Sequence, residues 1–271
     1  MGERDPSDTR HVETHPAGGE ERSEVARRQP WQGGIRLEPL ANLAHELRTP
    51  LQVMLGYVDI LREEWAGELS PEPLEILERL RINAHELTHT LGNLMELATA
   101  QAGGEAVLEE EIDVADLVDD LTCVLEAANR RKGLALDFEL EEAPKSILSD
   151  RRLLRSILVN LALNAIKFTA AGSVIVAVRR RQAGSGEEWV EFEVRDSGPG
   201  IAPELLDRAF QPFAQLSNSS TRRHRGLGLG LALVRRHVQS LGATLEVSSS
   251  PGNGSSFVVR IPIKGAGVAA A

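Results

Sequence analysis

Apolar residues recur every three or four positions between residues 38 and 64, which predicts one long amphipathic helix and not a strand. His45, Glu46 and Thr49 fall off this apolar stripe, so we expect their side chains on the polar face of the helix. Pro50 lacks a backbone donor and predicts a local kink beside His45. The stripe consists of Leu40, Leu43, Leu47, Leu51, Met54, Val58, Leu61 and Trp65.

A second helix is predicted from about residue 73 to residue 102, because its apolar positions alternate in steps of three and four. Gly67 and the Pro-containing cluster at residues 70–73 interrupt the pattern and predict a turn between the two helices. Such an antiparallel hairpin cannot bury both apolar seams by itself, so we expect two copies to pair into a four-helix bundle, as a homodimer. The second seam consists of Leu77, Leu80, Ala84, Leu87, Leu91, Leu94 and Ala98.

A domain boundary is predicted at Gly103-Gly104, where the pattern changes. Beyond it, helical and strand patterns alternate irregularly, which predicts a two-layer α/β sandwich after the helical hairpin. The expected organisation is a disordered tail at 1–36, a helical domain at 37–102, an α/β domain at 105–264 and a second disordered tail at 265–271. Within the second domain the expected helices are 113–131, 150–168 and 228–241, and the expected strands are 134–140, 146–148, 174–178, 189–194, 244–249 and 255–263.

Composition narrows the class of protein. With 271 residues, 42% of them hydrophobic, the chain has room for two globular domains. The 40 acidic and 30 basic residues give a net charge of −10, which argues against nonspecific binding to nucleic acid. We expect a cytoplasmic location, because there is no secretory pattern and no apolar run of the ~18 residues that a membrane helix needs. The single cysteine, Cys123, excludes an internal disulfide and is expected in the core.

A polar stripe on the expected helix 150–168 is the first chemical signal of the second domain. Asn160, Asn164 and Lys167 follow one another at i, i+4 and i+7 and therefore share one helical face. Amide oxygens suit a hard cation such as Mg²⁺, and a lysine ammonium suits phosphate oxygens. The alternative is an ordinary solvated stripe.

A carboxylate followed by two glycines is the second signal. Asp196 ends an expected strand, and Gly198 and Gly200 follow it. The carboxylate can accept a hydrogen bond from an exocyclic amine, and the glycines let the backbone approach a ring system. The same pattern also fits an ordinary strand-ending turn.

A glycine-rich segment opens the last expected helix and is the third signal. Its glycines expose backbone N–H groups and point a helix N-terminus towards an anion, with the preceding Arg222, Arg223 and Arg225 within reach of phosphates. The segment matches neither the dinucleotide fingerprint nor a P-loop. Phe210 and Phe213, upstream of it, are typical of an aromatic anchor for a hinged lid, or of a surface loop with two core-facing rings. The glycine-rich segment consists of Gly226, Leu227, Gly228, Leu229 and Gly230.

The second helix also contains a match to a zinc motif. His85-Glu86-Leu87-Thr88-His89 fits H-E-x-x-H, in which two histidines one turn apart bind Zn²⁺ and the glutamate activates water. Both histidines lie off the apolar seam, and no convincing third ligand follows. We therefore favour two solvated histidines over a zinc hydrolase.

These signals, in this order and after a His-Glu-Leu-Arg-Thr-Pro helix, closely resemble a bacterial two-component sensor histidine kinase over residues 37–264. The resemblance implies a dimerisation and histidine-phosphotransfer domain, followed by an ATP-binding domain with the Bergerat fold of the gyrase, chaperone, kinase and mismatch-repair superfamily. It implies autophosphorylation by ATP, transfer of the phosphoryl group to an aspartate of a response regulator, and phosphatase activity towards that regulator.

By this resemblance His45 is the phosphoacceptor, Glu46 orients and deprotonates the imidazole, and Thr49 helps to position water during dephosphorylation. Asn164, helped by Asn160, holds Mg²⁺. The remaining implied ATP contacts are Lys167, Phe168, Asp196, Gly198, Gly200, Ile201, Arg225, Gly226, Leu227, Gly228, Leu229, Gly230 and Ser255.

The resemblance further implies a receiver domain as partner, and a separate sensory partner, because the N-terminal tail is too polar to build a sensor. Departures from the family pattern are mild. Ala44 stands where Ser is usual, Pro199 where a small or branched residue is usual, Phe168 where Tyr is usual and Ser255 where Thr is usual. An ATP-holding scaffold that signals by conformation is the alternative, and the adjacent His45 and Glu46 favour the kinase.

Overall fold

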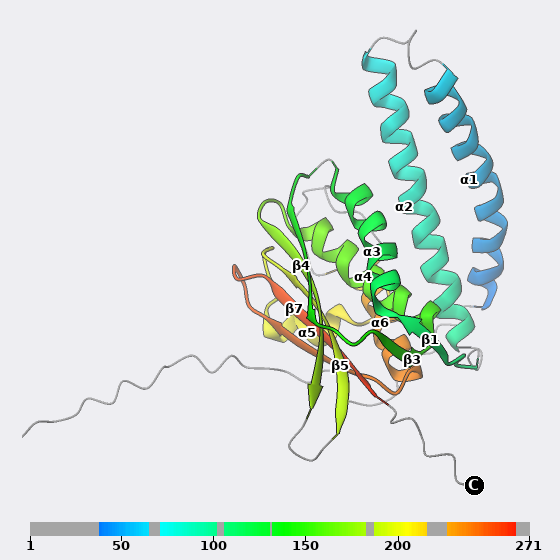
Figure 1. The fold of residues 1–271 in the computed structure, drawn as a ribbon. Coiled ribbons are helices and arrows are strands. Elements are labelled where there is room, and N and C mark those ends of the chain that lie inside the picture. Colours follow the sequence, from blue (N-terminus) through cyan, green and yellow to red (C-terminus); the bar gives the residue numbers. More distant parts are fainter. Residues whose placement is uncertain are drawn as a thin grey trace, which may run out of the picture.

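The structure is a computed structural model, and it describes residues 38–64, 71–101, 106–130, 132–182, 187–215 and 227–263. Two long helices, α1 (Glu38–Glu64) and α2 (Pro71–Gln101), form a hairpin that stands beside an α/β domain (Figure 1). Pro50 lies inside α1. A helical hairpin followed by an α/β sandwich is the predicted fold class, and it is confirmed.

The hairpin buries only part of the predicted apolar stripe of α1, together with residues outside it. Ala44, Leu51 and Leu55 are buried, whereas Leu47 and Met54 of the predicted stripe are 46% and 61% exposed in the single chain. The apolar residues of α1 cover more than one face, so the three-to-four spacing alone did not identify the face that packs on α2. The large apolar side chains exposed along the two helices are Leu47, Val53, Met54, Tyr57, Ile60, Leu61, Ile76, Leu80 and Leu87.

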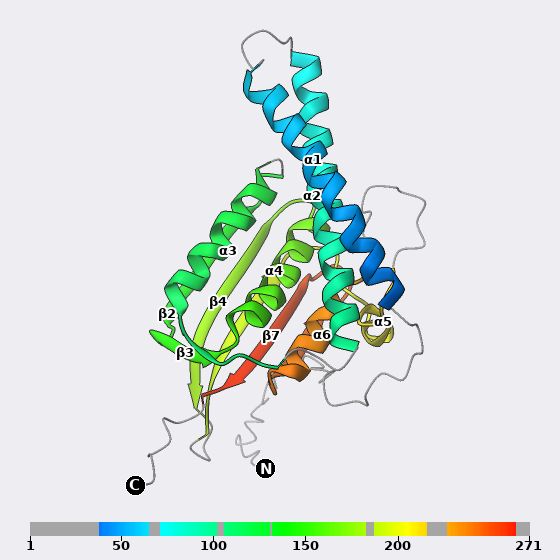
Figure 2. The same ribbon diagram turned by 90° about the vertical axis from the view of Figure 1, so that its right-hand side faces the viewer.

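A five-stranded sheet with the strand order β2-β4-β5-β7-β6 forms one layer of the second domain. The β2–β4 pair is parallel and the other pairs are antiparallel, while β1 and β3 form a separate two-stranded sheet. Helices α3, α4 and α6 form the other layer on one face of the sheet (Figure 2). The elements are β1 (Glu110–Asp113), α3 (Val114–Asn129), β2 (Ala135–Glu142), β3 (Ser146–Ser149), α4 (Arg151–Phe168), β4 (Ser173–Gln182), β5 (Glu188–Asp196), α5 (Pro203–Ala209), α6 (Gly230–Ser240), β6 (Thr244–Ser249) and β7 (Ser255–Pro262).

The core between the two layers fixes α4, the helix with the polar stripe. Leu154 and Ile157 of α4 are fully buried against a cluster that includes Leu121 of α3 and Phe192 of β5. Asp150 caps the start of α4 by accepting the backbone N–H of Leu153 at 3.0 Å. Because one face of α4 is committed to the core, its polar face points away from the sheet.

Several local predictions were incomplete or wrong. Strand β1 and helix α5 were not predicted, because each is too short to show a period. Strand β4 extends past the expected 174–178. Arg179 in this extension forms ion pairs with Glu139 and Glu193 on the neighbouring strands, and a search for apolar residues misses such charged strand positions. Cys123 is exposed on α3 and not in the core. Both predicted tails lie outside the described residues.

None of the helices in the described part of the chain is both long and apolar enough to cross a membrane.

Candidate functional site

The polar stripe of α4 forms one wall of the candidate site. Asn160 is 4% exposed, and Asn164 and Lys167 are partly buried one and two turns further along the helix. The Lys167 Nζ atom lies 5.4 Å from the centroid of the Phe168 ring, which is itself 47% exposed. The stripe therefore begins at the buried Asn160 amide and ends at the exposed Phe168 ring, with the Lys167 ammonium beside that ring.

Asp196 forms the floor of the site at the end of β5. Its Oδ1 accepts the backbone N–H of Gly198 at 2.8 Å, and strand register places it opposite Ser255 of β7. Burial raises the pKa of Asp196 above its usual value, and the hydrogen bonds from Gly198 and Ser255 only partly oppose this rise. A desolvated acceptor of this kind gains stability from a further donor, such as the amine of a bound ring.

Thr169 and Gly198 complete this floor. The Thr169 hydroxyl is buried and has no hydrogen-bond partner among the described residues. A Cβ atom on Gly198 would lie 2.7 Å from Asp196 Oδ1 and 3.1 Å from Thr169 Oγ1. Thus a carboxylate, an unpaired hydroxyl and a position without a side chain lie next to one another, which suits a ligand with polar groups on a flat ring.

Gly200 has a structural reason to be glycine. Its φ is +68°, and a Cβ atom there would lie 2.0 Å from the carbonyl oxygen of Ser250. The next residue, Ile201, donates its backbone N–H to Ser249 Oγ at 2.7 Å, and its side chain packs against the main core. Gly200 and Ile201 therefore anchor the loop after β5 to the β6–β7 turn.

The glycine-rich segment is described from Leu227 onwards; Arg222, Arg223, Arg225 and Gly226 lie outside the described residues. The Phe213 N–H donates to the carbonyl oxygen of Gly228 at 3.0 Å. Gly228 has a φ of +68°, and a Cβ atom on it would lie 2.3 Å from the Ala214 carbonyl oxygen. This hydrogen bond thus joins the backbone before residue 216 to the backbone after residue 226, and Phe210 belongs to the buried core.

Gly230 brings the start of α6 against the α4 stripe. A Cβ atom on Gly230 would lie 2.9 Å from Asn160 Oδ1 and 3.5 Å from Asn164 Nδ2. The N-terminus of α6 and the two amides therefore face the same space. A helix N-terminus favours anions and amide oxygens favour hard cations, so this corner suits a phosphate group together with its metal ion.

The turn of α1 that contains His45 lies close to this corner. The backbone of His45 and Glu46 belongs to α1, while their side chains lie outside the described set. Ala44 is 1% exposed and shares an apolar cluster with Leu229 and Leu233 of the α6 region. The chain position next to His45 is thus part of the contact between the hairpin and the second domain.

Lys132 was not predicted from the sequence. Its Nζ donates to the carbonyl oxygens of Ile166 and Lys167 at 2.6 Å each and of Thr169 at 2.9 Å. It therefore caps the C-terminal end of α4, directly under the polar stripe. A lone lysine in a helix-to-strand turn gives no periodic signal, whereas Thr169 could have been noticed from its place directly after Phe168.

Residues of both α2 and α4 line a cavity of about 440 Å³, among them His89 of the zinc-like motif, Asn93, Glu96 and Asn160. Burial lowers the pKa of His89, Glu96 opposes this, and Lys167 adds to it. His85 is exposed on the same helix. Over the described ranges, no three His, Cys, Asp or Glu side chains come together in a metal-binding group.

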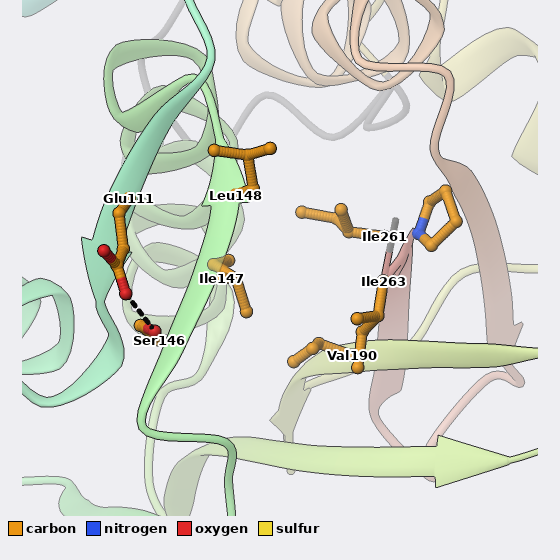
Figure 3. A pocket seen from close by; sticks show the side chains of 8 residues that line it. Glu111, Ser146, Ile147, Leu148, Val190, Ile261 and Ile263 are labelled. Carbon is orange, nitrogen blue, oxygen red and sulfur yellow. Dashed lines mark hydrogen bonds between the residues drawn. The ribbon is translucent and has the colours of Figure 1, made fainter. Parts of the chain in front are cut away.

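A second cavity, of about 340 Å³, lies between β3 and the ends of β5 and β7 (Figure 3). Its lining is mostly aliphatic, with Ile147, Val190 and Ile261 facing the space, and Glu111 bonds to the hydroxyl of Ser146 at 2.7 Å. Val190 lies near the opposite end of β5 from Asp196. This cavity is therefore separate from the candidate site.

Two family models match the chain. The His Kinase A (phospho-acceptor) domain matches residues 36–103, which include His45. The histidine kinase-, DNA gyrase B- and HSP90-like ATPase matches residues 149–265, which include the α4 stripe, Asp196 and the glycine-rich segment.

Similar proteins fall in the same group. The sensor histidine kinase GacS of Pseudomonas protegens is 30% identical over 240 residues, which are 88% of this chain and 26% of that protein. A sensor-like histidine kinase of Rhizobium meliloti is 33% identical over 231 residues, which are 85% of this chain and 43% of that protein. The chain thus spans less than half the length of these relatives.

Solved structures agree with the fold. Full-length ShkA, in complex with AMPPNP, aligns with a TM-score of 0.63 and 30% identity, over 84% of this chain and 46% of ShkA. The Acinetobacter baumannii histidine kinase AdeS aligns with a TM-score of 0.54 and 25% identity, over 81% of this chain and 98% of AdeS.

Proposed function

Because the chain belongs to the two-component sensor histidine kinase family, we propose that it uses ATP to phosphorylate its own His45 and then passes the phosphoryl group to a response regulator. One observation carries the proposal. A single chain holds a phospho-acceptor helix and, packed against it, an ATPase fold in which Asn160 faces Gly230 at the start of α6 and Asp196 faces Gly198 at the end of β5.

The adenine end of the substrate is proposed to lie on Asp196. Burial raises the pKa of this carboxyl, and an exocyclic amine would supply a further donor to it. The unpaired Thr169 hydroxyl and the open position at Gly198 support a ring edge at the same point. Phe168, 47% exposed at the end of α4, offers an apolar face to the nucleotide.

The phosphate end is proposed to lie between Lys167 and the N-terminus of α6. Asn160 and Asn164 fit Mg²⁺ through their amide oxygens, because they lie one turn apart on α4 and converge on Gly230, where a side chain is absent. Bound Mg²⁺ would neutralise charge on the transferring phosphoryl group. Lys167 and the backbone N–H groups of α6 hold the remaining oxygens. Arg225 and Gly226 are proposed contacts from outside the described residues.

The chemical step that we propose is an in-line displacement. An imidazole nitrogen of His45 attacks the γ-phosphorus, the bond to the β-bridging oxygen breaks, and ADP leaves with the electron pair. Glu46 takes the proton from the imidazole. In the second reaction an aspartate oxygen of the response regulator attacks the phosphorus and the N–P bond breaks.

The regulator is proposed to dock on the hairpin near His45. Thr49 follows His45 by one turn and its side chain is exposed, which supports a role in positioning water when the phosphorylated regulator is hydrolysed. The apolar side chains exposed along α1 and α2, such as Met54 and Leu80, support a homodimer in which a second hairpin covers them.

The proposal is tested with ATP labelled at the γ-phosphate. We expect an acid-labile, alkali-stable label on the wild-type chain in the presence of Mg²⁺, and none on His45→Gln or Asn164→Ala. Adding purified receiver domains should then move the label to one of them. A wild-type chain that binds ATP but acquires no label would overturn the kinase and favour the scaffold.

A further inference from the structure

The C-terminal half of α2 packs directly on the second domain. Leu91, Leu94 and Ala98 of α2 form one buried cluster with Leu229 and Leu233 at the start of α6. In Figure 2 this part of α2 runs beside α4 and α6. The hairpin and the nucleotide-binding fold are therefore in contact along the face that carries the polar stripe.

Buried polar contacts accompany this apolar contact. The Asn93 amide of α2 donates to Asn160 Oδ1 at 2.9 Å, and both side chains are more than nine-tenths buried. One turn further along α2, Oε2 of Glu96 accepts the hydroxyl of Ser156 at 2.9 Å and lies 3.0 Å from Nε2 of His237, which is 3% exposed. Three polar contacts thus join α2 to α4 and α6.

The Glu96 carboxylate takes part in two of these contacts, and its side chain is 38% exposed. Burial raises the pKa of Glu96, but the hydrogen bonds from His237 and Ser156 lower it by more, so the group stays ionised inside the contact. Removing one partner of this partly buried carboxylate leaves part of its charge without compensation, which the remaining solvent contact moderates. The contact is therefore specific in register and not a loose apolar association.

Asn160 is where this interface meets the proposed chemistry. Its Nδ2 donates to the Ser156 carbonyl oxygen at 2.9 Å, and its Oδ1 already accepts from Asn93. A Cβ atom on Gly230 would lie 2.9 Å from the same oxygen. An N–H group and a metal ion both direct positive charge at the oxygen they approach, so they repel each other when they share it.

We propose that Asn93 and Glu96 form an interdomain latch, which holds the second domain on the hairpin with the Asn160 oxygen occupied and which must open before Asn160 can serve metal–nucleotide binding. This inference rests on the proposed function, because it assigns a regulator to that same site. By thermodynamic linkage, Mg²⁺–nucleotide weakens the latch as much as the latch weakens nucleotide binding. A shift of α2 along α4 would therefore change nucleotide affinity with no change in the site residues.

The first test measures binding of a non-hydrolysable ATP analogue by calorimetry. A single hydrogen bond of this kind is worth a roughly two- to tenfold change in affinity, so Asn93→Ala and Asn93→Asp should bind the Mg²⁺–analogue tighter by that factor. In EDTA the same variants should equal the wild type, since only the metal uses the Asn160 oxygen. The control is Asn83→Ala, an exposed asparagine of α2 whose amide bonds within its own helix to Arg79.

The second test measures the latch without nucleotide. Cys123 is the single cysteine and is exposed on α3, so a second cysteine at Glu75, which is exposed on α2, gives a spin-label pair across the contact. Labelled chains are diluted with unlabelled ones to avoid distances between copies. Asn93→Asp should broaden the distance distribution of the ligand-free protein, and the Mg²⁺–analogue should do the same to the wild type.

Contradictory results are separable. If Asn93→Ala binds the Mg²⁺–analogue more weakly than the wild type, Asn93 supports the nucleotide site. If it binds like Asn83→Ala and the spin-label distance is unchanged, the Asn93 contact has no effect on the nucleotide site. Either result overturns the latch. If the wild type does not bind the Mg²⁺–analogue at all, the proposed function fails, and the spin-label distance in Asn93→Asp still decides whether Asn93 holds the domains together.

Discussion

Replacing Gly198 by alanine tests the proposed adenine contact without removing a polar group. Gly198 is buried and its φ is not positive, so the backbone accepts alanine. The added methyl group would lie 2.7 Å from Asp196 Oδ1 and 3.1 Å from Thr169 Oγ1. The carboxylate must therefore move by roughly 0.7 Å to restore ordinary contact, away from the position that receives the ligand.

The magnitude follows from this displacement. Adding a methyl group to a packed site costs about 1–3 kcal/mol of stability. Loss of a hydrogen bond to a charged acceptor costs about 1.5–3 kcal/mol, so ATP affinity should fall roughly 10- to 150-fold. Calorimetric titration with ATP and unfolding in urea measure the two quantities separately.

A matched control separates folding from binding. Gly242 has a φ of +63° and open space at its Cβ position, at the far end of α6. Gly242→Ala places a side chain in left-handed backbone at a cost of about 1–2 kcal/mol, while touching nothing in the site. Wild-type ATP affinity in Gly198→Ala, or an equal loss of affinity in Gly242→Ala, would refute the reasoning.

Three further outcomes are expected. Lys132→Met removes three hydrogen bonds to carbonyl oxygens at the end of α4 and should lower the free energy of unfolding by about 1–2 kcal/mol in urea titrations; an unchanged value would exclude this cap. Asp196→Asn should abolish ATP binding yet raise the melting temperature at neutral pH. Because burial raises the pKa of Asp196, the protonated carboxyl contributes its full stability below the unfolded-state pKa of about 4. This stability is lost as the pH rises through the pKa of the folded state. The difference in melting temperature between the variant and the wild type should therefore disappear in acid. Met54→Glu combined with Leu80→Glu should convert a dimer into monomers in light scattering, and an unaffected mass would contradict the predicted bundle.

Long periodic segments were predictable from the sequence, and short or charge-paired ones were not. The bounds of α1 and α4 were predictable because many apolar residues in each segment repeat at helical spacing, and because Asp150 caps the start of α4. Strand β1 buries one large side chain, Ile112, so it has no pattern to detect. Cys123 was misplaced because a small apolar residue in a helical pattern does not reveal which face it occupies.

The candidate site was predictable as a set of residues but not as a geometry. Spacing on one helix placed Asn160 beside Asn164, whereas their approach to Gly230 depends on how α6 packs. The contact between Asn93 and Asn160 joins residues 67 positions apart, and nothing local in either segment indicates it. Long-range partners such as these are decided by tertiary packing, which sequence spacing does not encode.

The most direct test of the account maps the phosphorylated atom. The chain has seven histidines, including His85 and His89 on α2 and His237 at the domain contact. After reaction with Mg²⁺–ATP, tandem mass spectrometry under alkaline conditions should place a single phosphoryl group on an imidazole nitrogen of His45. Modification of His85, His89 or His237 in place of His45 would contradict the account, and so would a chain that hydrolyses ATP with every histidine unmodified.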